Sequence, residues 1–285
     1  MKLSPRECAM LREMGVAWPD SPELAATNAV PNTAEAPTPA RTPRPAAGPA
    51  PVPLSLPDAS AWQVQTSWEA LQSAVASCRR CGLCKTRRQT VFGVGHSRAH
   101  WMVVGEAPGE QEDRQGEPFV GAAGQLLDRM LAAIGLSRGG AELQVAADRG
   151  GSRGQAASDV AAQRVFITNT VKCRPPQNRN PDPVELAACE PVLRQQMAWV
   201  QPRLILAMGR FAAQQLLRSD ELIGRLRGRV HRLSSTDAPW AGPQGVPVVV
   251  TYHPAYLLRN PRDKAKAWDD LCLALDTMAA ASQPQ

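Results

Sequence analysis

The sequence predicts a three-layer α/β domain, in which a central, mainly parallel sheet of four strands carries helices on both faces. Two observations lead to this fold class. Short apolar runs alternate with longer segments whose apolar residues recur at helical spacing. A run such as 101–104 is continuously apolar, which is typical of a strand buried on both faces. The strands are expected at residues 101–104, 165–168, 204–207 and 247–250.

Amphipathic segments flank the expected strands. In the last of them, Trp268, Leu271 and Leu275 recur at the spacing of a helix that packs on a core. Strands that alternate with helices indicate a parallel sheet covered on both sides. The helices are expected at residues 62–76, 122–134, 183–200, 210–217 and 262–279.

The chain is expected to have three regions. Residues 1–20 form a short helix, because Ser4 to Glu7 is a capping box with Pro5 at the first helical position. Residues 21–60 hold ten of the 26 prolines and form a disordered linker. Residues 61–282 form the main domain, with an insertion loop at 138–163. The first helix is either a vestigial tail or a segment that binds a protein partner, and its capping box favours the partner.

Charge and composition narrow the class of protein. The chain has 285 residues and a net charge of +6, which suits a nucleic-acid partner but is also common in other proteins. No apolar run reaches the length of a membrane span, and no signal peptide is evident. We therefore expect a monomeric, cytoplasmic protein of bacterial type, associated with the nucleoid and not with a membrane.

Cysteines form one group of candidate site residues. The seven cysteines are an odd number in a chain without a secretion signal, which favours thiolate chemistry over disulfides. Cys78 and Cys81 are a C-x-x-C pair, and Cys173 and Cys189 lie sixteen positions apart. This pattern predicts a metal site, and it leaves zinc or a redox dithiol open.

A Gly- and Pro-rich acidic loop follows the first strand. Open α/β sheets place their chemistry in the loops that leave the carboxyl ends of strands. The loop carries Glu106, Glu110, Glu112, Asp113 and Glu117, and then the apolar segment 118–120. A loop that is merely solvated has no reason to carry a phenylalanine, so a binding role is expected here.

Five segments stand out in order along residues 70–280: Cys78 to Cys81, Gly105 to Gly121, Ile167 to Pro176, Leu206 to Ala213 and His253 to Pro261. Together they resemble the family 4 iron–sulfur uracil-DNA glycosylases. The resemblance implies the uracil-DNA glycosylase fold, and removal of uracil from single- or double-stranded DNA in base excision repair. It also implies a four-iron, four-sulfur cluster on Cys78, Cys81, Cys173 and Cys189, with Cys84 as a bystander.

The same resemblance implies roles for residues of the base pocket. Phe119 would stack on the flipped uracil, and Asn169 would read its edge, since an amide both donates and accepts. His253 would donate to uracil O2, where negative charge develops. Glu112 would line the pocket as a catalytic carboxylate, and backbone contacts are expected from Glu106 and Ala107.

Two further predictions concern residues that do not bind the base itself. Asn178 is a candidate for orienting the attacking water, because Ala107 occupies the position where other uracil glycosylases have an aspartate. A loop formed by Leu257, Leu258 and Arg259 is expected to enter the duplex. The alternative function is a uracil-DNA binder on the same fold that does not turn over, and a zinc or redox protein is the third.

Overall fold

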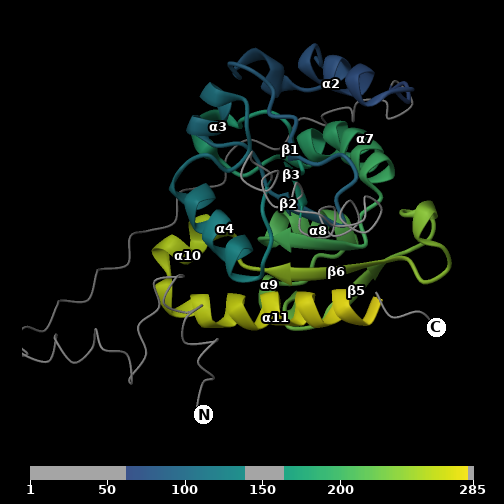
Figure 1. The fold of residues 1–285 in the computed structure, drawn as a ribbon. Helices are drawn as coiled ribbons and strands as arrows, with labels where there is room; N and C mark the ends of the chain where they lie inside the picture. The colour runs from purple at the N-terminus through teal and green to yellow at the C-terminus, as the bar shows by residue number, and fades with distance from the viewer. Residues whose placement is uncertain (1–61, 139–163, 282–285) are drawn as a thin grey trace, which may run out of the picture.

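The computed structural model describes residues 62–138 and 164–281 (Figure 1). The expected helix at 1–20, the linker at 21–60 and nearly all of the insertion loop lie outside these residues. Their predictions are therefore not tested by the structure. The described residues form one sheet with helices packed on both of its faces.

The sheet has six strands in the order β1-β3-β2-β4-β6-β5. The four expected strands form its centre, where β3–β2, β2–β4 and β4–β6 are all parallel pairs. The two edge strands pair antiparallel, so the expected count of four was too low. The bounds are β1 Val94–Gly95, β2 Trp101–Gly105, β3 Val165–Asn169, β4 Leu204–Met208, β5 Val230–Leu233 and β6 Val246–Thr251.

Alternate strand residues face two separate apolar cores. Val103 and Leu206 belong to the core under α4, α10 and α11, whereas Val104 and Ala207 belong to the core under α7 and α8. The three layers predicted from the apolar runs are thus present, with α11 and α7 on opposite sides of the sheet in Figure 1. The helix bounds are α2 Trp68–Ala76, α3 Glu110–Gln115, α4 Ala122–Ala133, α7 Pro183–Val200, α8 Arg210–Leu217, α9 Ile223–Leu226, α10 Pro254–Arg259 and α11 Lys264–Ala281.

Helix ends differ from the prediction where a local cap decides them. Helix α2 begins at Trp68 and not at 62, because the Ser67 hydroxyl accepts from the Ala70 N–H at 3.0 Å. Helix α11 begins at Lys264 because the 3₁₀ turn Pro261–Asp263 precedes it. The other 3₁₀ turns of the described residues are η3 Gly82–Lys85, η5 Pro176–Asn178 and η6 Pro239–Ala241.

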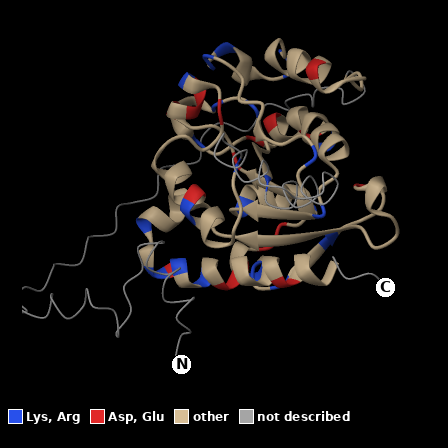
Figure 2. Ribbon diagram, in the orientation of Figure 1, with Lys and Arg blue, Asp and Glu red and all other residues tan. Residues whose placement is uncertain are grey.

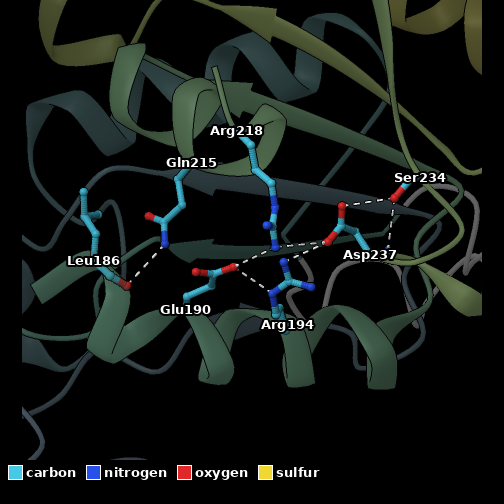
Figure 3. A network of polar contacts seen from close by, with 7 residues as sticks. All are labelled: Leu186, Glu190, Arg194, Gln215, Arg218, Ser234 and Asp237. Carbon is cyan, nitrogen blue, oxygen red and sulfur yellow. Dashed lines mark hydrogen bonds and ion pairs between the residues drawn. The ribbon is translucent and has the colours of Figure 1, made fainter. Parts of the chain in front are cut away.

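A network of charged side chains ties α7 and α8 to the loop after β5 (Figure 3). Arg194 on α7 lies 2.8 Å from Glu190 and 2.8 Å from Asp237. Arg218, which ends α8, reaches the same two carboxylates at 3.5 and 3.4 Å. Ser234 also donates to Asp237 at 3.1 Å. Networks hold a geometry better than isolated surface pairs do, so this one fixes the loop that returns to β6.

Candidate active site

One cavity lies at the edge of the sheet where all four parallel strands end. Its lining includes residues that end or follow β2, β3, β4 and β6, as expected for the carboxyl edge of an open α/β sheet. The structure thereby brings together residues from segments that lie up to about 150 positions apart in the sequence. The lining includes Glu106, Ala107, Glu112, Phe119, Asn169, Asn178, Gly209, Arg210, Tyr252, His253 and Arg259.

Gly105 allows two of these side chains to approach the end of β2. A Cβ atom at this position would lie 2.4 Å from Asn169 Oδ1 and 2.6 Å from Phe119 Cζ. Real Cβ atoms do not come so close to such neighbours. Any residue other than glycine would therefore push the amide and the phenyl ring out of the cavity wall.

Asn169 ends β3 with a buried acceptor that has no partner. Only 2% of the residue is exposed, and its Oδ1 makes no hydrogen bond within the part of the chain that the structure describes. A buried polar atom without a partner is costly, and such atoms in native proteins point to a ligand or water. The Asn169 side chain thus has an unused hydrogen-bonding edge at the cavity.

His253 caps α10 and stacks on Phe119. The two ring centroids lie 5.3 Å apart with an interplanar angle of 28°. Nδ1 accepts from the Ala255 N–H at 3.2 Å, which leaves the proton of a neutral imidazole on Nε2. Burial, together with the nearby charge of Arg259, lowers the pKa of His253 to about 4. The ring is therefore a neutral hydrogen-bond donor at ordinary pH.

Glu112 lines the cavity, but its carboxylate is already occupied. Oε2 accepts from the Gly109 N–H at 3.0 Å, and Oε1 accepts from the N–H groups of Val120 and Gly121 at 3.1 and 3.4 Å. These bonds join the start of α3 to the loop that carries Phe119. Three backbone donors thus hold the Glu112 carboxylate in place, which supports a positioning role, while its expected catalytic role stays a prediction.

Glu106 was expected to offer only its backbone, yet its side chain also lines the cavity. Its carbonyl oxygen accepts from the Thr170 hydroxyl at 2.5 Å and the Val171 N–H at 3.3 Å. Burial raises the pKa of the Glu106 carboxyl, and the nearby Arg210 opposes that rise. Sequence reasoning missed this carboxylate, although its position directly after a strand-ending glycine was a usable signal.

Asn178 lines the opposite wall, and its side chain has a protein partner. Its Oδ1 accepts from Arg174 Nε at 2.7 Å, and Arg174 also lies 3.6 Å from Glu110. Both Gln177 and Asn178 have positive φ angles, 56° and 55°. This tight 3₁₀ turn places Asn178 in the cavity lining, where the bond to Arg174 competes with a water for its side-chain oxygen.

The expected DNA-entering segment divides between core and surface. Leu257 is fully buried in the core beside α4, whereas its neighbours reach the surface, and its predicted part in the intercalating loop stays untested. Its burial follows from the need of α10 to place one apolar face on the domain. Leu258 is 44% exposed, and Arg259 is exposed and lines the cavity.

A second cavity is lined by five cysteines, about α2, η3 and α7. They are Cys78, Cys81, Cys84, Cys173 and Cys189. Among the described residues, no three such side chains converge closely enough to hold one metal ion. A single zinc ion needs its thiolates about 2.3 Å from one point, whereas an iron–sulfur cluster binds each thiolate through a different iron. Thiolates spread around a cavity therefore fit a cluster better than a single ion.

Two hydrogen bonds point at the cysteine sulfurs. Arg87 Nη1 donates to Cys173 Sγ at 2.9 Å, and the Lys172 N–H donates to Cys189 Sγ at 3.3 Å. Such donors suit sulfurs that carry negative charge. Burial raises the pKa of Cys173 to about 12 and that of Cys189 to about 11. Burial thus disfavours the thiolate form of both sulfurs, and the positive charges of Arg87 and Lys172 favour it.

Charged side chains of both signs are spread over the helices (Figure 2). The cationic residues Arg179, Arg210 and Arg259 contribute to the lining of the first cavity. Cations at a site favour a phosphate backbone as the partner. Among the described residues, no helix combines the length and the apolar character that a membrane span requires.

Comparison with known proteins identifies the family. Residues 92–272 match the family model of the uracil-DNA glycosylase superfamily. The type-4 uracil-DNA glycosylase of Archaeoglobus fulgidus is 40% identical over 192 residues, which are 66% of this chain and 81% of the relative. The type-4 enzyme of Pyrobaculum aerophilum is 38% identical over 209 residues, 72% of this chain and 91% of the relative. The type-5 uracil-DNA glycosylase of Pyrobaculum aerophilum is 33% identical over 168 residues, which are 58% of this chain and 66% of the relative. The chain therefore belongs to the uracil-DNA glycosylase superfamily.

Proposed function

We propose that this protein excises uracil from DNA by hydrolysing the N-glycosidic bond, which leaves an abasic site for repair. The observation that carries the proposal is the unpartnered Asn169 Oδ1 in a cavity that also holds the stacked rings of Phe119 and His253. A flipped pyrimidine base needs an apolar surface to stack on and polar groups to read its edge. The arginines in the cavity lining suit the DNA backbone.

Base selection is assigned to Asn169. Its free Oδ1 accepts from uracil N3–H, and its Nδ2 donates to O4. Phe119 supplies the apolar surface beside it, and Gly105 keeps the space for both side chains open. Glu112 holds the Phe119 loop through backbone hydrogen bonds and so acts by positioning.

Leaving-group stabilisation is assigned to His253. Uracil departs as an anion, with charge developing on O2. A neutral imidazole with Nε2–H donates to that oxygen without any proton transfer. Because burial already keeps the ring neutral, the donor needs no reorganisation when charge develops.

The attacking water is assigned to Glu106 and not to Asn178. Glu106 lines the cavity, and no donor among the described residues binds its carboxylate oxygens in competition with a water. The Asn178 Oδ1 already accepts a hydrogen bond from Arg174 Nε. An oxocarbenium-like sugar is a strong electrophile, so the carboxylate mainly has to orient the attacking water.

The direct test uses the full chain and an oligonucleotide with one uracil. Alkaline cleavage followed by gel separation is expected to show strand breaks at the uracil position in molar excess over the protein. Release of at most one uracil per chain would favour the non-turnover binder instead. Absence of any break, on single- and double-stranded substrates alike, would contradict both.

The low pKa of His253 predicts a flat pH dependence for its contribution. The ring stays neutral above its folded pKa of about 4. The ratio of excision rates for wild type and His253→Ala should therefore stay constant between about pH 5 and pH 8. A ratio that falls by tenfold across this window would mean that an imidazolium is needed and would contradict the assignment.

The same depressed pKa has a consequence for stability with a defined sign. The unfolded state binds a proton below the ordinary value of 6.5, whereas the folded state does so only near 4. The contribution of His253 to the free energy of unfolding is therefore lost progressively as the pH falls below 6.5.

The second cavity is proposed to hold a four-iron, four-sulfur cluster on Cys78, Cys81, Cys173 and Cys189. When bound, the cluster supplies a rigid covalent junction. The four cysteines come from the segment after α2, from the loop after β3 and from α7, so ligation would fasten these parts together.

Cysteine substitutions test this ligand set. Cys173→Ala and Cys189→Ala are expected to lose the visible cluster absorption and much of the soluble protein, because ligation and folding are coupled. Cys84→Ala should retain the absorption and the iron. Cys84 is the matched control, because it lines the same cavity. Bleaching by Cys84→Ala alone would overturn the assignment.

The exposed end of α10 is proposed to contact the DNA next to the flipped base. Leu258 and Arg259 are proposed to enter the space that the flipped nucleotide leaves, with Leu257 as their buried anchor. A DNA substrate requires the enzyme to work in the compartment that holds the chromosome. A monomeric state, and a protein partner for the helix at 1–20, remain predictions from the sequence.

A further inference from the structure

Lys172 is a buried cation that the proposed reaction does not use. Only 1% of its surface is exposed, and it directly precedes Cys173. Its Nζ donates to Thr168 Oγ1 at 2.6 Å and to the carbonyl oxygen of Asn169 at 2.6 Å. Both acceptors are neutral. Within residues 62–138 and 164–281, no Asp or Glu forms an ion pair with Lys172.

A buried ammonium without a counter-charge is strongly destabilising. The candidates for that charge lie in the cysteine cavity, because Lys172 lines it together with Cys173 and Cys189. The Lys172 N–H also donates to Cys189 Sγ. As cluster ligands these sulfurs would be thiolates. The ligated cluster thus provides the negative charge that the described protein groups around Lys172 lack.

The Lys172 ammonium also contacts Asn169, which lines the base cavity. Asn169 carries its amide side chain at the cavity wall, and its carbonyl oxygen is held by Lys172. Thr168, the second acceptor, is itself fixed because its hydroxyl donates to the Phe92 carbonyl oxygen at 2.9 Å. Lys172 therefore joins a cluster ligand to the base-reading residue within the five residues from 169 to 173.

We propose that Lys172 is a positioning residue that couples the iron–sulfur cluster to the base pocket: its ammonium takes the cluster as its counter-charge and holds the Asn169 carbonyl in place. The identity of the base pocket rests on the proposed function. The charge relation with the cluster does not depend on uracil excision, so the two can fail separately.

The test compares Lys172→Met and Lys172→Gln with Thr168→Val in the full-length holoprotein. Both Lys172 variants lack the charge, whereas Thr168→Val disturbs the same buried hydrogen bonds and keeps the charge. The reduction potential of the cluster, measured by voltammetry, should become more negative in both Lys172 variants and stay unchanged in Thr168→Val. Loss of iron to a chelator should be faster in the Lys172 variants by about 10- to 100-fold.

Uracil binding separates the hydrogen bond from the charge. Glutamine can still donate to the Asn169 carbonyl, whereas methionine cannot. KM for a uracil-containing oligonucleotide should therefore rise more in Lys172→Met than in Lys172→Gln. Loss of the cluster from both Lys172 variants, with retention by Thr168→Val, would also support the proposal. Wild-type potential and iron retention in both Lys172 variants would overturn it, whereas failure of the wild type to release uracil would contradict only the proposed function.

Discussion

Replacement of His253 by alanine is expected to lower the rate of uracil release by about two to three orders of magnitude, while uracil-containing DNA still binds. The reason is that the Nε2–H donor acts on charge that exists only during bond cleavage. Single-turnover rates and DNA affinity, measured on the same preparations, test this expectation. A rate within a few-fold of wild type would remove His253 from the mechanism.

A control is needed because His253 is half-buried and stacks on Phe119, so its replacement could disturb the fold. His231→Ala is a suitable match, since His231 lies on the edge strand β5 and contacts the Leu226 carbonyl oxygen, outside the cavity lining. It should excise uracil at the wild-type rate. Thermal unfolding of both variants shows whether any loss of rate comes from loss of fold.

Replacement of Asn169 by aspartate should reduce uracil excision most severely, by up to about four orders of magnitude. A carboxylate accepts but does not donate, so it repels uracil O4. Cytosine presents an N4 amino group there and suits the carboxylate better. Rejection of cytosine by the natural asparagine follows from the same pairing, since donor would face donor and acceptor would face acceptor.

The measurement is the release of both bases from matched single-stranded oligonucleotides. The Asn169→Asp variant is expected to show a changed ratio of cytosine to uracil release, with cytosine release limited by its poorer leaving group. Asn260→Asp is the matched control, because Asn260 bonds the Tyr256 carbonyl oxygen outside the cavity lining. Unchanged uracil excision by Asn169→Asp would mean that another residue reads the base.

The central sheet could be predicted because buried parallel strands are apolar along their length. Strands β2 and β4 are buried at every position, and their bounds were found to within one residue. The edge strands were missed for the opposite reason. Strand β5 contains His231 and Arg232 and is largely exposed, and β1 has only two residues. Neither offers an apolar run, so tertiary pairing alone defines them.

The candidate site was also predicted only in part from the sequence. Motifs identified Phe119, Asn169 and His253, and the structure places all three in one cavity. The direction of individual side chains could not be read in the same way. Whether a glutamate in the loop faces the cavity or binds backbone N–H groups depends on the path of the main chain, which distinguishes Glu106 from Glu112. The burial of Leu257 could not be predicted either, because it depends on which face α10 presents to the core.

The strand order also determines when activity can first arise during synthesis. A ribosome makes the chain from its amino end, and domains generally fold as units in that order. Phe119 and Asn169 emerge before β6, the strand that precedes His253 and covers one side of β4. A chain interrupted before β6 would hold the base-binding residues without the donor. It would also expose the edge of β4, which is buried and apolar in the complete protein and prone to pair with another chain. Truncated products should therefore aggregate and not act as partial enzymes.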